Sequence, residues 1–322
     1  MQIVLAPMEG VVDHLMRDML TRIGGFDLCI TEFVRVVDQR LPARVFRRLC
    51  PELEHGGKTP AGVPVRVQLL GQEPHWLAEN AAKAVQLGSP GIDLNFGCPA
   101  KTVNKSRGGA VLLKETEQLY QIVKAVRQAV PAEHPVSAKI RLGYDDTSLT
   151  LDNASAIEAA GASVLTVHAR TKSDGYKPPA YWPWIARIRQ RIAIPVIANG
   201  EIWTPDQAKQ CQQEANTQDI MLGRGALALP NLAQSIRSGQ PAMPWPEVLQ
   251  LLMRYSEFEV VGDKGKYYSN RIKQWFSYLK LQYPAAAELF SQLRLLKRNE
   301  DILQLLQQQL TTYSQQQDAP GQ

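Results

Sequence analysis

Eight short segments rich in aliphatic and β-branched residues recur along the chain. Consecutive segments begin 24 to 44 residues apart, about the length of a strand followed by a helix. Between them, stretches such as 75–88 and 117–130 have apolar residues at helical spacing, and Gly88 and Gly161 stand where helices are expected to end. The eight segments begin at Ile3, Leu28, Val65, Ile92, Val136, Val164, Val196 and Ile220.

Strand–helix alternation of this kind predicts an α/β fold, a (β/α)8 TIM barrel. An open doubly wound sheet is the structural alternative, but eight units that end near Gly225 fit the length of a barrel better. In such a barrel, functional residues gather at the C-terminal ends of the strands. Here those ends are polar or carry special residues: 7–9, 32–35, Gln68, 95–99, 139–141, 168–170, 199–201 and 223–225.

A proline-containing segment, residues 237–247, follows the predicted barrel and indicates a linker. Beyond it the apolar residues follow helical spacing, as in the stripe formed by Ile272, Trp275, Phe276 and Leu279. We therefore predict two domains. Residues 1–240 would form the catalytic barrel, and residues 241–322 a small all-helical domain that ends in a frayed tail.

Charge and composition limit the class of protein. The 322 residues are 44% hydrophobic, enough for a large core, and 36 basic against 31 acidic residues give a formal net charge of +5. Ten basic and six acidic residues lie between Ile236 and Glu300, so most of the surplus is in the C-terminal quarter. A local surplus can attract a polyanion, although from charge alone an ordinary solvated helical surface is the better explanation.

Several functional classes are disfavoured. No apolar run reaches the roughly 18 residues that a membrane span needs, and residues 1–10 lack the features of a secretory signal. The four scattered cysteines contain no CxxC pair, which disfavours a disulfide scaffold and a thiolate zinc site. We expect a cytoplasmic monomer that neither associates with a membrane nor binds a metal.

Two glycine turns at the ends of the last two strands point to an anionic ligand. Asn199-Gly200-Glu201 and Gly223-Arg224 lie where barrels commonly bind phosphate, because glycine lets the backbone approach the ligand. Tight strand–helix turns are the plain alternative.

Lys139 and His168 end two earlier strands and could hold an electron-rich ring, although a structural histidine is equally compatible. A lysine in an apolar strand needs a partner, which suggests a ligand or a Schiff base.

Cys98 follows the fourth strand in the sequence LNFGCPAK. Gly97 and Pro99 favour a turn that would present the thiol at the barrel mouth. An unperturbed thiol, with a pKa of about 8.5, is mostly protonated at neutral pH and can donate a proton to a carbanion-like centre. It can also act as a nucleophile if a base lowers its pKa. A small buried hydrophobe is the usual fate of a free cysteine and suits Cys29 and Cys50. The polar segment 104–109, which follows Cys98, could be a lid or only a connection.

Taken together, six motifs resemble those of the tRNA-dihydrouridine synthase family, and the resemblance covers essentially the whole chain. The segments ITEFVRVVDQ and RIKQWFSYL further resemble the C-type synthases, a subgroup associated with uridine 16 in the D-loop of tRNA. Members of the family often have glycines where Lys105 and Arg107 stand here. The six motifs are APMEG, LNFGCPAK, AKIRLG, VHART, IANGEI and GRGAL.

The resemblance implies FMN in the barrel mouth, NADPH as the electron donor, and tRNA as substrate and partner. The reduced flavin would pass a hydride to C6 of uracil, and Cys98 would protonate C5 to give 5,6-dihydrouridine. The positions that match the surroundings of the flavin are Pro7, Met8, Glu9, Gln68, Lys139, His168, Asn199, Gly200, Glu201, Gly223 and Arg224. Asn95, Arg141 and Tyr176 are implied near the uracil or its nucleotide.

The C-terminal domain supplies most of the candidates for contact with the tRNA backbone. Arg271 and Lys273 lie off the apolar stripe of RIKQWFSYL, so we expect them to face solvent, where they could also serve only to solubilise the helix. A base inside a folded tRNA must leave its stack to reach a flavin, and the protein must grip the RNA by shape and backbone. The four candidates are Arg35, Arg271, Lys273 and Arg294.

Three other functions remain open. A small-molecule flavin oxidoreductase on the same barrel would need no basic helical domain. An aldolase would use Lys139 as a Schiff base and would lack a yellow cofactor. A non-enzymatic RNA-binding protein would have no use for Cys98 and the phosphate turns.

Overall fold

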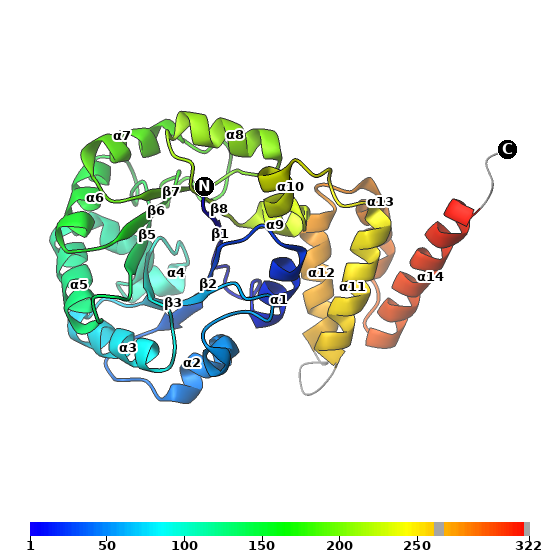
Figure 1. Ribbon diagram of the computed structural model, residues 1–322, viewed down its shortest axis with the longest axis horizontal. Coiled ribbons are helices and arrows are strands. Elements are labelled where there is room, and N and C mark those ends of the chain that lie inside the picture. Colours follow the sequence, from blue (N-terminus) through cyan, green and yellow to red (C-terminus); the bar gives the residue numbers. More distant parts are fainter. Residues whose placement is uncertain (261–266, 319–322) are drawn as a thin grey trace.

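Eight parallel strands form a closed barrel in the computed structural model, which describes residues 1–260 and 267–318 (Figure 1). Each strand pairs with the next one in sequence, and β8 returns to β1, so the predicted (β/α)8 barrel is confirmed. The strands are β1 (Ile3–Leu5), β2 (Leu28–Arg35), β3 (Val65–Leu70), β4 (Ile92–Phe96), β5 (Val136–Arg141), β6 (Val164–His168), β7 (Val196–Asn199) and β8 (Ile220–Leu222).

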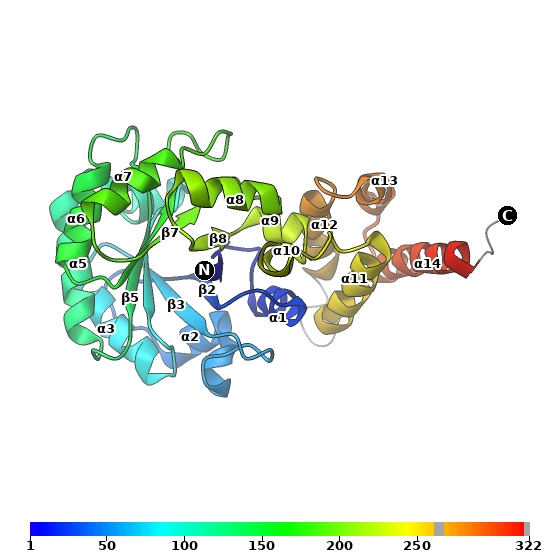
Figure 2. The same ribbon diagram turned by 45° about the horizontal axis from the view of Figure 1, so that its top comes forward.

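Helices surround the barrel and cover the outer face of the sheet (Figures 1 and 2). Helix α5 illustrates why: its Leu119, Ile122, Val123 and Val126 recur at helical spacing, and all four are buried. The helices of this part are α1 (His14–Ile23), α2 (Ala43–Leu49), α3 (Pro74–Gln86), α4 (Lys101–Lys105), α5 (Thr116–Ala129), α6 (Thr150–Ala159), α7 (Pro183–Arg191), α8 (Pro205–Glu214), α9 (Arg224–Ala228) and α10 (Leu232–Ser238), with 3-10 turns at Pro51–His55 and Gly109–Lys114.

Strand β2 contains an irregularity that affects the barrel mouth. Its pairing with β3 shifts register between Ile30 and Phe33. In a regular strand, consecutive side chains point to opposite faces, whereas a bulge re-aims them. As a result, Glu32 and Phe33 both line the pocket described below.

The C-terminal part is helical, as predicted, and packs beside the barrel (Figures 1 and 2). Helix α9 contacts α12, α1 contacts α11, and the Trp275 indole N–H donates to the Leu227 carbonyl at 3.1 Å. The predicted linker is too long at its C-terminal end, because α11 already begins at Trp245 and Pro246 fits its first turn. The helices are α11 (Trp245–Val260), α12 (Tyr268–Leu279), α13 (Pro284–Leu293) and α14 (Asn299–Asp318). Part of the tail expected to fray belongs to α14, and residues 319–322 lie outside the described residues.

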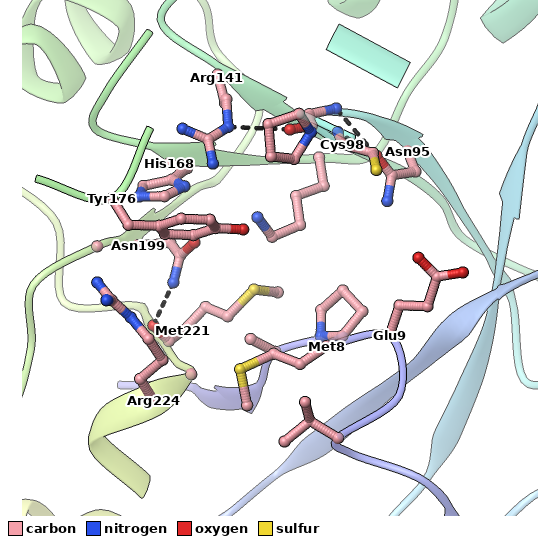
Figure 3. A pocket seen from close by; sticks show the side chains of 18 of the residues that line it. Met8, Glu9, Asn95, Cys98, Arg141, His168, Tyr176, Asn199, Met221 and Arg224 are labelled. Atoms are coloured by element: carbon pink, nitrogen blue, oxygen red, sulfur yellow. Dashed lines mark hydrogen bonds between the residues drawn. The ribbon is translucent and has the colours of Figure 1, made fainter. Parts of the chain in front are cut away.

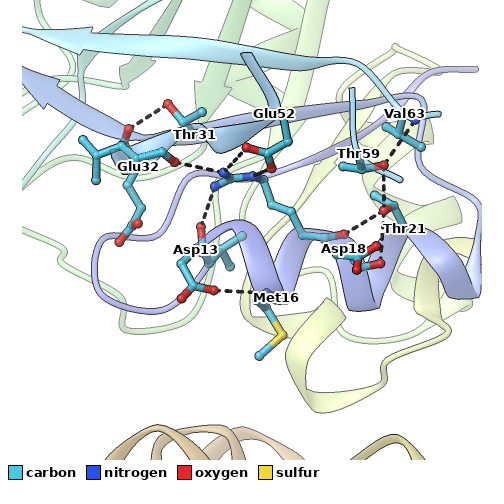
Figure 4. Close-up of polar contacts among 12 residues, drawn as sticks. Asp13, Met16, Asp18, Thr21, Thr31, Glu32, Glu52, Thr59 and Val63 are labelled. Atoms are coloured by element: carbon cyan, nitrogen blue, oxygen red, sulfur yellow. Dashed lines mark hydrogen bonds and ion pairs between the residues drawn. The ribbon is translucent and has the colours of Figure 1, made fainter. Parts of the chain in front are cut away.

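A buried ion pair links α1 to the turn after α2 (Figure 4). Both the Nε and Nη2 atoms of Arg17 donate to the Glu52 carboxylate, at 2.8 and 2.9 Å, and the two side chains are almost inaccessible. Burial alone would raise the pKa of Glu52, but the hydrogen bonds and charge of Arg17 lower it overall.

None of the described helices combines the length and apolar character that crossing a membrane requires.

Candidate active site

A cavity of about 510 Å³ opens at the C-terminal ends of the strands (Figure 3). This volume lies within the range of small-molecule and cofactor sites. The cavity is lined by Cys98 and by all of the residues predicted to surround a flavin: Pro7, Met8, Glu9, Gln68, Lys139, His168, Asn199, Gly200, Glu201, Gly223 and Arg224. Asn95, Arg141 and Tyr176, predicted near the substrate base, line it as well.

Cys98 sits in a turn that is pinned from both sides. The Asn95 side-chain oxygen accepts hydrogen bonds from the backbone N–H groups of Gly97 and Cys98, both at 3.0 Å. The Cys98 carbonyl accepts from the Asn104 side-chain amide at 2.9 Å and from the Ala110 N–H at 3.1 Å. These four hydrogen bonds hold the backbone of the Cys98 turn in place without help from a ligand.

The thiol of Cys98 is only half-buried, whereas Cys29, Cys50 and Cys211 are buried. This difference agrees with the expectation that Cys29 and Cys50 serve as small core residues. Burial and the nearby Glu9 carboxylate raise the pKa of Cys98. The group is therefore a protonated thiol at neutral pH, suited to donating a proton rather than to acting as a thiolate nucleophile.

A chain of hydrogen bonds connects the Cys98 turn to the barrel interior. Gln68 accepts from the Asn95 amide at 2.8 Å and donates to the Asp93 carboxylate at 2.7 Å, and Asp93 also accepts from Ser137 at 2.6 Å. Gln68, Asp93 and Ser137 are buried. Because each member fixes its neighbour, Asn95 has a defined orientation, with its amide nitrogen committed to Gln68 and its oxygen to the turn.

Lys139 and His168 supply two different kinds of group to the cavity. Burial and the adjacent Arg141 lower the pKa of Lys139 to about 8. Burial and the positive charges of Arg141 and Lys139 hold the pKa of His168 well below its ordinary value, so the imidazole is neutral at pH 7. A lysine whose charge is disfavoured in this way is stabilised by an anionic ligand.

Arg141 is almost fully buried and donates hydrogen bonds to backbone carbonyl groups. Its guanidinium donates to the carbonyls of Gly97, Thr171 and Gly175 at 2.9, 3.0 and 2.8 Å. It thereby ties the loop after β6 to the turn that contains Cys98. The same guanidinium lies 5.0 Å from the ring of Tyr176, a favourable distance for a cation–π contact.

The turns after β7 and β8 meet around Glu201. The carboxylate accepts from Arg170 and from the Trp203 indole, and Arg224 lies 3.6 Å away. Burial alone would raise the pKa of Glu201, but Arg170 and Trp203 lower it overall. Arg224 is 5.0 Å from the rings of both Tyr176 and Trp203 and keeps 29% of its side chain exposed. Figure 3 shows Arg224 on the side of the cavity away from Cys98.

Gly200 is the glycine whose role is clearest. It adopts φ +116°, and a Cβ at this position would lie 2.8 Å from Cδ2 of His168. No other residue type would allow the turn to pack against the imidazole in this conformation. The bare backbone here and at Gly223 leaves room beside Arg224 for a ligand.

The four residues predicted to contact the tRNA backbone are not among those that line the cavity, and they differ from one another. Arg35 and Arg294 are exposed, and Arg35 donates to the Ser106 hydroxyl at 2.6 Å. The expectation that Arg271 and Lys273 face solvent is wrong. Arg271 is 17% exposed and lies 2.8 Å from the Asp13 carboxylate, and Lys273 donates to the Leu296 carbonyl. Their positions off the apolar stripe reflect polar partners rather than water.

The segment 104–109 is not a loop throughout. Asn104 and Lys105 complete the short helix α4, and a 3-10 turn begins at Gly109. Asn104 is needed for packing, because its side chain contacts three backbone groups, those of Cys98, Ala100 and Val111. Arg107 is paired with Glu115 at 2.9 Å.

Three aromatic residues of the cavity, Phe33, Trp203 and Tyr278, were not predicted as site residues. Trp203 follows the IANGEI motif, and its indole could have been expected to join Glu201 at the mouth. Tyr278 belongs to α12 and reaches the barrel cavity from the helical domain. The position of Tyr278 in RIKQWFSYL did not predict this, because only the packing of the helical region against the barrel brings the side chain to the cavity.

Known proteins resemble this chain in sequence. A family model described as dihydrouridine synthase (Dus) matches residues 4–315. The chain is 60% identical to the tRNA-dihydrouridine(16) synthase of Shewanella oneidensis, with 96% of this chain and 98% of that one covered. It is 55% identical to the enzyme of the same name from Escherichia coli K12, with 95% and 98% covered.

Solved structures resemble the fold at low sequence identity. One is a 2-naphthoyl-CoA reductase complex, with a TM-score of 0.56, 14% identity, and 74% of this chain and 50% of that one covered. Another is described as TcOYE with pHBA, with a TM-score of 0.51, 13% identity, and 75% and 90% covered. Because the family match spans nearly the whole chain and the relatives exceed half identity, the protein belongs to the dihydrouridine synthase family.

Proposed function

We propose that this protein is a tRNA-dihydrouridine synthase that reduces uridine 16 in the D-loop of tRNA, with FMN as cofactor and NADPH as reductant, in the cytoplasm. The observation that carries the proposal is the position of the Cys98 thiol, in a fixed turn on one wall of a cavity whose opposite side carries Arg224. The relatives named for this reaction support the choice of substrate and position.

The residues of the cavity fit a flavin phosphate. Arg224, which is partly exposed, and the bare turns at Gly200 and Gly223 suit a phosphate, since guanidinium and backbone N–H groups bind it well. The charged form of Lys139 is disfavoured by burial, so an electron-rich ring system nearby would stabilise it. Met8 and Met221 would offer apolar side chains to the ring system. Bound there in its reduced form, the flavin supplies the hydride for C6 of uracil.

The chain itself provides the proton and the position of the base. Hydride addition to C6 leaves excess electron density at C5, and the Cys98 S–H bond breaks as its proton forms the new C5–H bond. The raised pKa keeps the thiol protonated before the reaction, and water restores the proton afterwards. Asn95 and Tyr176 line the same space, where an amide and an aromatic ring can hold an extruded pyrimidine.

The test is to map dihydrouridine in tRNA from a bacterial strain that lacks its own uridine 16 synthase. The gene of this chain should restore dihydrouridine at position 16, and the Cys98→Ala variant should not. Restoration at another position would contradict the site assignment. Purified protein should act on tRNA and leave free uridine unchanged, whereas rapid reduction of a free pyrimidine or an enone would favour a small-molecule oxidoreductase.

A further inference from the structure

The loop between β1 and α1, residues 6–13, forms one wall of the cavity. Met8, Glu9 and Val11 line the space in which the flavin is proposed to bind. The loop turns back on itself, because the Met8 carbonyl accepts from the Val11 N–H at 3.0 Å. On the barrel side, the Gly10 N–H donates to the Glu32 carboxylate at 2.5 Å. The Ala6 N–H also donates to the Leu222 carbonyl at 2.9 Å, and Arg17 donates to the Val12 carbonyl at 3.2 Å, so barrel contacts hold the loop at several points.

Two further contacts with the loop come from the helical domain. Nη1 of Arg271, on α12, donates to the Gly10 carbonyl at 3.1 Å, and Nη2 lies 2.8 Å from Oδ2 of Asp13. Its Nε donates to the Tyr255 hydroxyl on α11 at 3.2 Å. A planar guanidinium can make these contacts together, and its contact with Tyr255 holds it in place within its own domain.

Asp13 connects these contacts to the start of α1 (Figure 4). Its Oδ1 accepts from the Met16 N–H at 3.0 Å and caps the helix, while Oδ2 faces Arg271. One side chain of the helical domain thus contacts the loop at two residues, Gly10 and Asp13, on either side of the pocket-lining Val11.

We propose that Arg271 is a positioning residue through which the helical domain fixes the 6–13 loop, and that the barrel therefore holds its flavin at full affinity only when this contact is made. The inference rests on the proposed function, because it assumes that a flavin binds beside Met8 and Glu9. It gives Arg271 a role other than the phosphate contact expected from the sequence.

The expected size of the effect follows from the fraction of molecules whose loop is correctly arranged. The apparent dissociation constant rises in inverse proportion to that fraction. If loss of Arg271 leaves the loop in place for roughly a tenth of the time, the dissociation constant for FMN rises about tenfold. The chemistry at Cys98, on another wall of the cavity, needs no change for this effect.

The experiment titrates FMN into the flavin-free full-length protein and follows the quenching of flavin fluorescence. We expect Arg271→Ala to raise the dissociation constant about tenfold, and Arg271→Lys to recover part of the loss. Asp13→Asn should have a similar effect while it preserves the helix cap, because asparagine caps as well as aspartate does. Arg298→Ala is the matched control in the same domain, since Arg298 is exposed and pairs only at the surface with Glu300.

A double-variant cycle separates positioning from unrelated damage. If Arg271 acts through Asp13, the double variant should bind FMN little worse than either single variant. Should Arg271→Ala fail to fold in a thermal unfolding experiment, Asp13→Asn decides the question. In tRNA binding, the salt dependence of Arg271→Ala should equal that of the wild type.

Two results would overturn the inference. Arg271→Ala and Asp13→Asn could both bind FMN as the wild type does, or Arg271→Ala could flatten the salt dependence of tRNA binding with an unchanged FMN constant. The second result would return Arg271 to the role of a phosphate contact. If the wild type itself bound no FMN, the proposed function would fall, and that failure is distinct from either result.

Discussion

The side-chain oxygen of Asn95 accepts a hydrogen bond from the backbone N–H of Cys98 at 3.0 Å, so the strand that ends at Phe96 determines where the thiol lies. The amide nitrogen of Asn95 is committed to Gln68, which is held in turn by the buried Asp93. The position of the proposed proton donor is therefore fixed by a chain of hydrogen bonds that begins inside the barrel. An acid placed in this way avoids the cost of ordering it during the reaction.

Replacement of Cys98 by alanine should stop turnover without emptying the cavity. In the proposed reaction the thiol contributes a proton, and loss of a positioned general acid typically costs about 10² to 10⁴-fold in rate. The turn is held by backbone contacts to Asn95 and Asn104, which alanine retains. Flavin absorbance and tRNA affinity should match those of the wild type, and single-turnover oxidation of the reduced enzyme by tRNA reports the rate. Normal dihydrouridine formation by this variant would remove Cys98 from the mechanism.

The Lys139 ammonium should make flavin affinity depend on pH. Burial and Arg141 lower its pKa to about 8, so without a ligand the side chain loses its proton as the pH rises through this value. An anionic ligand favours the charged form, and the dissociation constant for FMN should therefore rise above pH 8, by at most about tenfold per pH unit. Lys139→Met should bind FMN weakly and lose this dependence. A variant with the same pH profile as the wild type would show that the profile arises elsewhere, for example in the flavin.

Gly200→Ala should damage the site more than an equivalent change elsewhere. Positive φ strains an alanine by about 1 to 3 kcal/mol, and at Gly200 the new Cβ would also lie 2.8 Å from the His168 ring. Gly56→Ala is the matched control, because Gly56 has φ +74° and a Cβ added there would meet nothing within 4 Å. Chemical denaturation should show a larger loss of stability for Gly200→Ala, together with weaker FMN binding. Equal losses and unchanged FMN binding would mean that His168 moves aside without consequence.

The barrel and most of the cavity could be predicted from the sequence because strand ends are encoded locally. An apolar segment followed by Lys139, His168 or Asn199 predicts both a strand and the residue that this strand places at the barrel mouth. In a closed parallel barrel, all such ends converge on one face, so residues far apart in the chain become neighbours without further information.

What could not be predicted depends on how the helical domain docks. Lys273 has the helical spacing of a surface residue, yet it donates to the Leu296 carbonyl, a contact that depends on packing inside the helical domain. Arg271 has similar spacing, but docking on the barrel brings it to the Gly10 carbonyl. Tyr278 enters the cavity for the same reason. The register shift in β2, which turns Phe33 into the mouth, likewise has no signature in residue type.

The salt dependence of tRNA binding should distinguish the basic residues that contact phosphate from those with structural partners. Each lost phosphate contact reduces the slope of log K against log salt by about 0.7 to 0.9. Arg294→Ala and Arg35→Ala should each lower the slope by roughly this amount, because both side chains are exposed and able to meet a backbone. Lys273→Ala should leave it unchanged, since that ammonium already donates to the Leu296 carbonyl. Binding measured by filter retention at several salt concentrations gives the slopes, and a lower slope for Lys273→Ala alone would reverse the assignment.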